Sequence, residues 1–458
     1  MSLRRISKAR FDALTYARHP YHFLVAEEAE WFSDPDEHVL GVLLRDRTDN
    51  DWNYVLVGRD ERGLFRYIQG DGSIESRTDA RNALLKALQE QSATGQYEFP
   101  QGDVRHKKNE IYRVAVPESR LNPHFLTLAR EERYSPAKEI IQEIAYALAN
   151  VDGNFIEDFQ SQGFNARLWE LYLLAYLHED LFTVERPKPS PDFKATNPLV
   201  TVFVEAVTVN PSPGFDIKRP PQTPEELTEL VNNYAPIKYG SPLYSKLGKE
   251  YWKQDHVAGQ PLVFAIHDFH AGDSMCWSYP AVGQYLYGLR WKHIFDAHGN
   301  LVVVPEKVDV HRFGSKEIPS GFFSLPDSRH VSAVLYSNSA TLPKFNRMGK
   351  LAGFGSPRVC MRRVGICYDH TPNAAAPKEF SVDITPDSYA ETWGQGTEMY
   401  HNPNALHPIP PEAFPGIAHH FLENDLMRSI LPAFSPYSSK TLIWLSKEDP
   451  PPPTTVNL

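Results

Sequence analysis

Cysteine is scarce in this sequence, since only three of its 458 residues are cysteines. So few cysteines cannot form a disulfide framework, and their scarcity is typical of proteins from a reducing compartment. Long hydrophobic runs are also lacking, because no window approaches the roughly 18 consecutive apolar residues of a membrane span. The basic N-terminus lacks the apolar run and small-residue cleavage site of a secretory signal. We therefore expect a cytoplasmic protein with no membrane segment.

An excess of positive charge is lacking as well. The chain has 47 Lys and Arg residues against 57 Asp and Glu residues, which gives a formal net charge of −10. This balance argues against a protein that coats nucleic acid non-specifically, although it permits an enzyme with one local basic face. Apolar residues make up 41% of the chain, which is enough to bury a sizeable core and excludes wholesale disorder.

The 38 prolines are clustered, and the clusters indicate how the chain is divided. They concentrate in residues 186–198, 210–224 and 407–415, where we expect turns and connections because proline fixes φ and lacks an amide donor. We predict an N-terminal α+β accessory domain over residues 1–135 and a central α/β domain over 136–350. A loop-rich region over 351–449 is expected to pack on this core, and the proline-rich tail 450–458 is expected to be disordered.

Hydrophobic periodicity predicts the main elements of the first two domains. In the N-terminal domain, strands are predicted near residues 39–44, 54–57 and 64–68, and a helix over 79–91. In the central domain, helices are predicted over 137–148, 164–178, 241–253 and 279–289, and strands over 199–209, 261–267 and 331–336. This order predicts an α/β fold in which a mixed sheet is flanked by helices on both faces.

Two predicted elements each carry a carboxylate where none is expected. The helix over 164–178 is apolar nearly all the way round, so it should be buried, yet it contains Glu170. An ion pair with Arg167, three residues earlier, would account for Glu170 without any functional role. The strand over 199–209 is apolar on both faces, and Glu205 is its only charge.

A third acid, Asp192, stands thirteen residues before Glu205, at a turn that leads into the sheet. Asp192 and Glu205 on adjacent strands, with Glu170 from a flanking helix, would bring three carboxylates to one point. Three close carboxylates cannot all ionise without a cation, and Mg²⁺ prefers all-oxygen ligands. A metal ion held there could activate a water and neutralise charge on a phosphoryl oxygen, although the Pro191-Asp192 pair could also simply initiate a turn.

This order of residues resembles the PD-(D/E)XK nuclease superfamily. The resemblance covers a helix with Glu170, then Pro191-Asp192, then a strand with Glu205, then a helix and the strand PLVFAI, roughly residues 160–270. It implies a restriction-endonuclease-like αβββαβ core and hydrolysis of phosphodiester bonds, usually in DNA. It also implies Mg²⁺ as cofactor, with Mn²⁺ as a possible substitute, and Glu170, Asp192 and Glu205 as its ligands. A role in bacterial defence, with a homodimer or a partner subunit, would suit such an enzyme.

The sequence departs from the superfamily pattern at the motif lysine. Glu-X-Lys is expected, but the chain has Val207 in the place of the lysine. Because some superfamily members supply the lysine from a neighbouring element, Lys246 and Lys249 on the following predicted helix are the candidates, with Lys194 as a third. We favour Lys246, near the start of that helix. These lysines could equally form a solvated helix face.

A basic stretch lies further along the chain, between Thr341 and Arg363. It contains no acidic residue, and two phenylalanines lie among its basic residues. Such a stretch could be a rim that binds nucleic-acid phosphates, or it could be a solvated basic loop. Its basic residues are Lys344, Arg347, Lys350, Arg358, Arg362 and Arg363.

Two other functions are compatible with the sequence. The absence of lysine at Val207 would also fit a nuclease-like fold that has lost catalysis and binds nucleic acid or a partner protein. A hydrolase of another kind could use His267 or Asp268, which close the strand predicted over 261–267. The leading hypothesis is a Mg²⁺-dependent endonuclease in which Asp192 and Glu205 act with Lys246 or Lys249.

Overall fold

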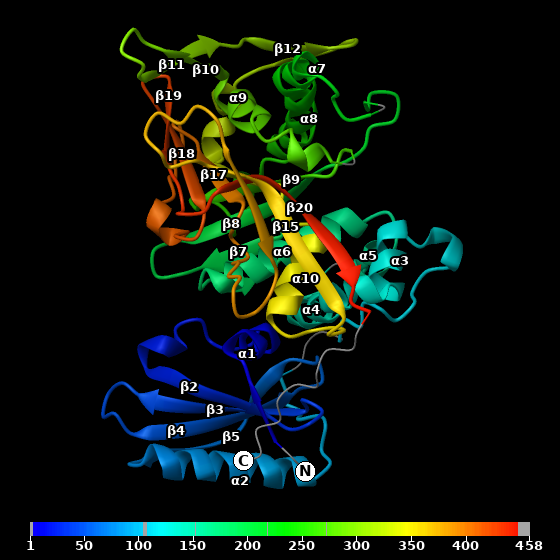
Figure 1. Ribbon diagram of the computed structural model, residues 1–458, viewed down its shortest axis with the longest axis vertical. Coiled ribbons are helices and arrows are strands. Elements are labelled where there is room, and N and C mark those ends of the chain that lie inside the picture. Colours follow the sequence, from blue (N-terminus) through cyan, green and yellow to red (C-terminus); the bar gives the residue numbers. More distant parts are fainter. Residues whose placement is uncertain (1–2, 104–107, 152, 218, 272, 448–458) are drawn as a thin grey trace.

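The N-terminal part of the chain forms an antiparallel sheet of five strands in the order β1-β2-β3-β4-β5 (Figure 1). The structure is a computed structural model that describes residues 3–103, 108–151, 153–217, 219–271 and 273–447. Helix α2 covers one face of the sheet with Leu84 and Leu88, which contact Phe32 and Leu56. The elements are β1 (Arg4–Ile6), α1 (Lys8–Leu14), β2 (Ala26–Ser33), β3 (Val39–Asp46), β4 (Trp52–Arg59), β5 (Phe65–Ile74) and α2 (Arg77–Ala93).

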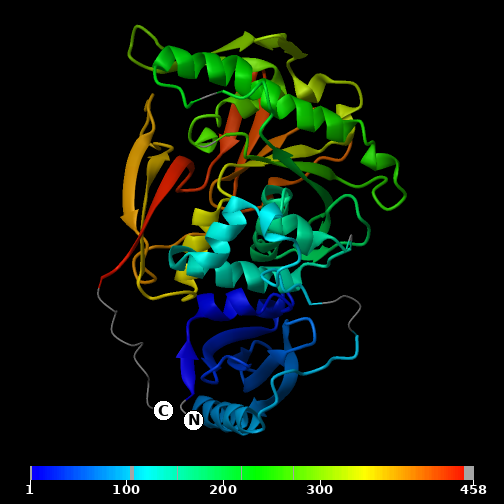
Figure 2. The same cartoon turned by 90° about the vertical axis from the view of Figure 1, so that its right-hand side faces the viewer.

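The other face of this sheet packs toward the rest of the molecule. Phe11 and Leu14 of α1 share one hydrophobic core with Ile140 and Ile144 of the following helices. Figure 2 shows α1 lying between the N-terminal sheet and those helices. The N-terminal part is therefore attached by buried apolar contacts. The helices that follow are α3 (Pro123–Arg130), α4 (Ser135–Ala147), α5 (Phe155–Gln160) and α6 (Phe164–Glu179).

A mixed sheet of eight strands forms the centre of the molecule, in the order β19-β18-β17-β14-β9-β8-β7-β6. The adjacent strands β8, β9 and β14 run parallel to one another, whereas β7 is antiparallel to both β6 and β8. The strands are β6 (Thr183–Glu185), β7 (Phe193–Thr196), β8 (Thr201–Val209), β9 (Leu262–Asp268), β14 (Ala333–Ser337), β17 (Thr397–His401), β18 (Ala418–Glu423) and β19 (Leu426–Ile430). The prediction of an α/β fold with a mixed sheet flanked by helices is confirmed at this level.

Helices cover both faces of β8, as the apolar residues on its two faces predict. Val202 and Val204 belong to the core that contains α6, whereas Phe203 and Val207 pack with Tyr239 of α8. Helix α7 (Pro224–Glu229), a π-helical turn (Leu230–Tyr234) and α8 (Ala235–Leu247) follow one another as a nearly continuous rod (Figure 2). The predicted helix over 241–253 is therefore wrong in its bounds, and Lys246 lies near the end of α8 instead of near its start.

The C-terminal region is more regular than the expected loop-rich segment. Strands β17, β18 and β19 complete the central sheet, and a separate sheet of three strands has the order β16-β15-β20. Strand β17, for example, is only five residues long and carries the polar residues Glu398 and His401, so it lacks the apolar pattern that identifies β8. The expected disordered tail, 450–458, lies outside the described residues. The remaining elements are α9 (Ala281–Tyr287), β10 (Leu289–Phe295), β11 (Leu301–Lys307), β12 (Val310–Phe313), β13 (Lys316–Pro319), α10 (Leu342–Leu351), β15 (Val359–Cys367), β16 (Lys378–Asp383) and β20 (Pro436–Leu445).

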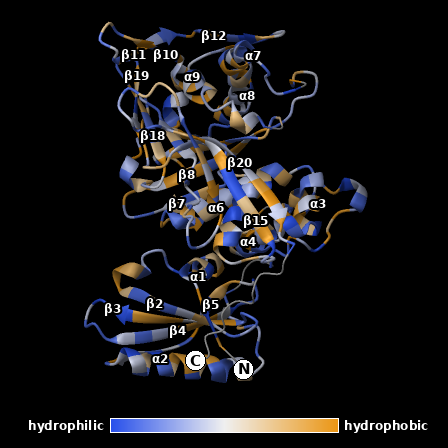
Figure 3. Cartoon of the chain, in the orientation of Figure 1, coloured by the Kyte–Doolittle hydropathy of each residue, from blue (hydrophilic) through white to orange (hydrophobic). Residues whose placement is uncertain are grey.

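The distribution of hydropathy agrees with this layering. Figure 3 shows α2, at the outer surface of the N-terminal part, with hydrophilic and hydrophobic residues in alternation. Helix α6, by contrast, is buried along almost its whole length. Within the described ranges, no helix combines the length and the apolar character that crossing a bilayer requires.

Candidate functional site

Asp192 and Glu205 are brought together by the pairing of β7 with β8. Asp192 directly precedes β7, whose first residue, Phe193, is paired with Val204. Asp192 therefore lies opposite Glu205, which is in the middle of an interior strand of the sheet. The backbone amide of Ala206 donates to Asp192 Oδ2 at 2.8 Å, which fixes one oxygen of this carboxylate. The two acids thus lie close to each other on adjacent strands.

Glu205 is buried in the sheet, and its two oxygens have different surroundings. Oε1 accepts from Lys246 Nζ and from the Tyr251 hydroxyl, the latter at 2.8 Å. Oε2 is buried and has no hydrogen-bond partner among the described residues. A buried carboxylate oxygen left in this state is costly unless it meets a cation or a water. The geometry therefore leaves Oε2 available to a ligand.

Of the three lysines considered, the structure brings Lys246 to the carboxylates. Its side chain reaches Glu205 from α8 and is 31% exposed, so its ammonium borders solvent. Lys249 is exposed two residues beyond the end of α8, and Lys194 pairs with Glu185 at 2.9 Å. Lys246 alone of the three thus occupies a position from which an ammonium group could support chemistry at Glu205.

Glu170 pairs with two arginines. Arg167 donates from Nη1 to Glu170 Oε1 at 2.7 Å, so the helical ion pair considered from the sequence is present. Arg186 donates from Nη1 to Oε2 at 3.2 Å. The same guanidinium reaches Asp192 Oδ1 through Nη2 at 3.5 Å, and its side chain is only 3% exposed. Arg186 therefore bridges two of the three carboxylates on which the metal prediction rests.

The electrostatic environment favours a cation beside Asp192. Burial raises the pKa of Asp192 to about 8, and the charges of Glu170 and Glu205 act in the same direction. The Ala206 amide and Arg186 oppose this increase. Among the residues that the structure describes, no group of three or more His, Cys, Asp and Glu side chains is arranged to hold a metal ion. Beside Asp192, Glu205 contributes a buried oxygen that has no hydrogen-bond partner among the described residues.

Two residues of this cluster, Arg186 and Tyr251, were not identified from the sequence. Arg186 follows the short strand β6 and begins a proline-rich connection, where no periodicity marks a buried residue. Tyr251 lies five residues after Lys246, in a short turn after α8. An aromatic residue near the end of a helix is too common to indicate a hydrogen bond to a distant acid.

The alternative centred on His267 and Asp268 is enclosed within the fold. Both residues are fully buried at the end of β9. His267 Nε2 accepts from the backbone amide of Ala340 at 2.9 Å. Asp268 Oδ2 accepts from the Ser278 hydroxyl, and Oδ1 contacts His270. The contacts of this pair therefore hold neighbouring loops in place.

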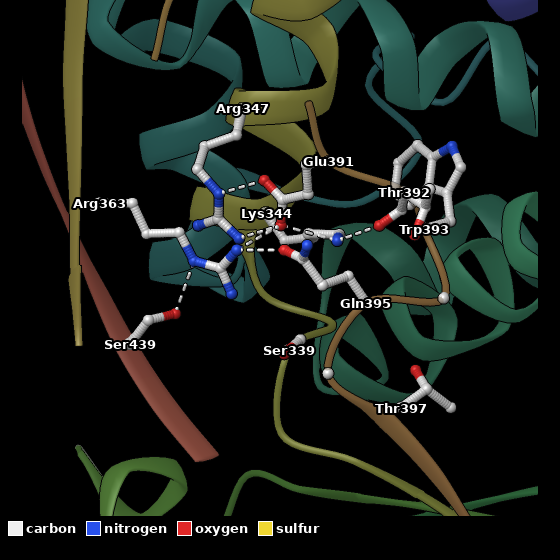
Figure 4. Close-up of polar contacts among 12 residues, drawn as sticks. Ser339, Lys344, Arg347, Arg363, Glu391, Thr392, Trp393, Gln395, Thr397 and Ser439 are labelled. Carbon is white, nitrogen blue, oxygen red and sulfur yellow. Dashed lines mark hydrogen bonds and ion pairs between the residues drawn. The ribbon is translucent and has the colours of Figure 1, made fainter. Parts of the chain in front are cut away.

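The basic stretch between residues 341 and 363 does not form an exposed rim, which corrects the phosphate-binding prediction. Figure 4 shows Lys344 and Arg347 of α10 and Arg363 of β15 turned toward Glu391. Their side chains are 0%, 4% and 1% exposed, respectively. Arg347 contacts both Glu391 oxygens at 2.7 Å, and Lys344 Nζ lies 2.8 Å from Oε1. These three cations therefore form buried ion pairs with Glu391 and are not available to bind phosphate.

The other three basic residues of the stretch are less buried but are largely engaged. Arg358 pairs with Glu132 at 3.4 Å, and Arg362 pairs with Asp383 at 2.6 Å. Lys350 is half-buried, and burial lowers its pKa. The acids that neutralise this stretch lie far away in the sequence, so their absence between residues 341 and 363 gave a false indication of an unpaired basic surface.

Two hollows lie outside the carboxylate cluster. A cavity of about 720 Å³ lies between α1 and α6, and Tyr16, His178 and Trp393 are among its lining residues. A smaller hollow of about 280 Å³ lies at the end of β8 and along α8, where Ser245 lines it directly before Lys246. Neither hollow is lined by Asp192 or Glu205, but the smaller one borders β8 and α8, which carry Glu205 and Lys246.

Comparisons with known proteins add no assignment. No protein-family model matches the chain, and no curated protein and no solved structure matches it either. The function must therefore be argued from the contacts of the site.

The raised pKa of Asp192 predicts a pH-dependent loss of stability in the metal-free protein. Between the ordinary pKa near 3.8 and the raised value near 8, the native state keeps a proton that the unfolded chain has lost. Stability contributed by this group must therefore fall as pH rises through that window. In EDTA, we expect the Tm of Asp192→Asn minus that of the wild type to increase between about pH 5 and about pH 8.

The exposed Asp103 provides the control for this measurement. Arg66 lowers the pKa of Asp103, so this group is ionised throughout the window. The Tm difference between Asp103→Asn and the wild type should therefore stay constant with pH. A difference for Asp192→Asn that also stays constant would contradict the proposed protonation of Asp192.

The cluster around Glu391 predicts a large structural effect from a small substitution. Burial alone would raise the pKa of Glu391, but Arg347, Lys344 and Arg363 hold it well below its ordinary value. Glu391→Gln would leave these buried cations uncompensated, so we expect a loss of about 3–5 kcal/mol in the free energy of unfolding. Urea denaturation measures this loss. The control is Glu132→Gln, which removes an exposed pair with Arg358 and should cost about 1 kcal/mol or less. Equal losses of unfolding free energy in the two variants would contradict the structural role of the buried Glu391 cluster.

Proposed function

We propose that this protein is a Mg²⁺-dependent nuclease that hydrolyses phosphodiester bonds in DNA. The observation that carries the proposal is the contact between Lys246 and Glu205, beside Asp192. An aspartate, a glutamate and a lysine around one solvent-bordering point are the groups that the PD-(D/E)XK resemblance requires. In this proposal, Lys246 would take the part of the lysine that the sequence motif lacks.

The order of elements supports the same proposal. The chain passes through α6, β6, β7, β8, α8 and β9, which agrees with the αβββαβ order implied by the resemblance. The connection from β8 through α8 to the parallel strand β9 places α8 on the face that carries Glu205. This connection explains how a lysine of α8 can reach the carboxylate of β8.

The position of Val207 supports a lysine contributed by another element. Val207 is on the same face of β8 as Glu205, and it packs with Tyr239 and Leu243 of α8. A lysine at residue 207 would have to bury its ammonium among these apolar side chains. Lys246 avoids this cost because it approaches Glu205 from near the end of α8 and remains partly exposed.

The chain's own groups define what each residue would do. Asp192 and Glu205 would hold the divalent ion, with Glu205 offering the buried Oε2 atom. Tyr251 and Lys246 both contact Oε1, and so they hold the carboxylate in one orientation. Bound Mg²⁺ would supply Lewis acidity toward a phosphoryl oxygen and lower the pKa of a water. Lys246, as the partly exposed cation, would stabilise negative charge that develops on the phosphate.

An inactive nuclease-like module is the second candidate, and Arg186 favours it. A guanidinium that bridges Glu170 and Asp192 already neutralises part of the negative charge that would attract a metal ion. In such a module the cluster would only hold the sheet and helices together. The two candidates differ in one measurable property, which is metal-dependent cleavage.

We predict that the purified chain cleaves DNA in Mg²⁺ or Mn²⁺ and does not cleave it in EDTA. Plasmid, single-stranded DNA and RNA should be tested as substrates. Asp192→Asn and Glu205→Gln should abolish cleavage, because each removes a carboxylate ligand. Lys246→Met should lower the rate by about 100-fold or more, as expected for the loss of one group that stabilises transition-state charge.

Two control lysines make the assay specific to the site. Lys194→Met removes a surface pair with Glu185, and Lys249→Met removes an exposed lysine close to Lys246 in sequence. Both variants should retain the wild-type rate. Cleavage that survives in Asp192→Asn would refute the site, and a loss in Lys249→Met without one in Lys246→Met would reassign the lysine. Absence of cleavage with DNA binding retained would favour the inactive module.

A further inference from the structure

The larger of the two hollows, the cavity of about 720 Å³, lies apart from the proposed nuclease site, since none of the three carboxylates of that site lines it. Its volume is in the range of cavities that hold small organic ligands. Met348 and Leu351 of α10, together with Trp393, give it apolar surface, while α1 and Tyr16 line it from the N-terminal part. The cavity therefore lies where the N-terminal part meets the centre of the molecule.

Glu179, the last residue of α6, brings a carboxylate to this cavity. Its Oε2 atom accepts from the backbone amide of Gly394 at 3.1 Å, which holds the carboxylate close to Trp393. Among the described residues, no cation forms an ion pair with Glu179. Negative charge is unfavourable at the C-terminal end of a helix, whereas a cation is favoured there. The carboxylate is thus held in place without being neutralised.

Three basic side chains around the cavity do not neutralise Glu179. Lys344 Nζ lies 2.8 Å from Glu391 Oε1, and Figure 4 shows the same ammonium directed at the carbonyl of Thr392. Arg18 forms ion pairs with two acids of the N-terminal part. Burial lowers the pKa of the His178 imidazole to about 4, so this ring is neutral at physiological pH. The cavity therefore contains a carboxylate whose charge partner is missing.

We propose that this cavity binds a small organic cation, namely a protonated amine with an apolar body, and that Glu179 is its charge partner. The ammonium group forms the ion pair that the described residues do not give to Glu179. The apolar body packs against Met348 and Leu351, and the face of an aromatic ring such as that of Trp393 also attracts cations. An anion would be repelled by Glu179, and a neutral ligand would leave this carboxylate unpaired and poorly hydrated.

The electrostatics of the empty cavity support this choice of ligand. Burial raises the pKa of Glu179 to about 7, and the charge of Asp180 acts in the same direction, whereas the Gly394 amide and Lys344 oppose the increase. Tyr16 faces the cavity as a neutral phenol, because burial raises its pKa. A bound cation would favour the ionised form of Glu179. Binding of an amine that stays protonated should therefore strengthen as pH rises through about 7.

The test uses phenethylamine, which carries an ammonium group on an aromatic body, and phenethyl alcohol as its neutral counterpart. Ligand-observed NMR titrations of the full chain at about pH 8 should give a Kd of about 1 mM or tighter for the amine. The alcohol should bind about tenfold more weakly or worse. Glu179→Gln should weaken binding of the amine by about tenfold and leave binding of the alcohol unchanged. The matched control is Glu27→Gln, which removes an exposed carboxylate lining the same cavity and should bind the amine like the wild type.

Thermal unfolding without any amine separates a binding role of Glu179 from a structural one. At about pH 8, Glu179→Gln removes a buried charge that has no described ion partner, so its Tm should equal or exceed that of the wild type. A lower Tm would show that Glu179 is a structural group and would overturn the proposal.

Three results of the titrations would also overturn it. These are no binding of phenethylamine, equal affinities for the amine and the alcohol, and an affinity of Glu179→Gln for the amine that equals that of the wild type. The nuclease proposal is tested separately, because Asp192 does not line this cavity. Asp192→Asn should therefore bind phenethylamine with the affinity of the wild type, whether or not it cleaves DNA.

Discussion

The buried carboxylate of Glu205 is the constraint on which the arrangement around the central sheet depends. Strand β8 is covered on both faces, so an ionised group on it loses its hydration and costs several kcal/mol unless it is paired. Lys246 of the last turn of α8 and Tyr251 of the short turn that follows α8 supply the compensating contacts. The end of the α7–α8 rod is thereby held against β8 by polar contacts, in addition to the apolar packing of Leu243 and Leu247.

A second buried carboxylate, Glu391, shows what a purely structural site looks like in the same molecule. Lys344, Arg347 and Arg363 surround it, and the Glu391 side chain is completely buried. Each Glu391 oxygen accepts from these cations or from Tyr389. The Glu205 cluster is neither fully hydrogen-bonded nor fully buried. One Glu205 oxygen has no partner among the described residues, and its partner Lys246 borders solvent. A closed cluster stabilises the fold, whereas an open one retains the capacity to bind a ligand.

The sequence was sufficient to predict the elements whose apolar pattern is strong, and this explains both the successes and the omissions. Helix α6 and strand β8 were predicted within two residues of their bounds, and Glu170 and Glu205 attracted attention as lone charges within them. Arg186, Tyr251 and Glu391 lie outside regular periodic segments. Among their partners, Glu170, Glu205 and Arg347 are 16, 46 and 44 residues away, respectively, and such contacts are revealed only by the folded chain. The basic stretch was misread for the same reason.

The supply of a lysine from α8 changes how the proposed site depends on folding. A lysine within β8 would be fixed by the strand itself, whereas Lys246 reaches Glu205 only when α8 is docked on the sheet. Val207, at the motif position, contributes to that docking through its contacts in the apolar core. In the proposed site, Val207 at the position where the resemblance expects a lysine and Lys246 at Glu205 would therefore be two parts of one arrangement. The valine strengthens the packing that delivers the lysine, so the completeness of the site and the stability of this helix–sheet interface are linked.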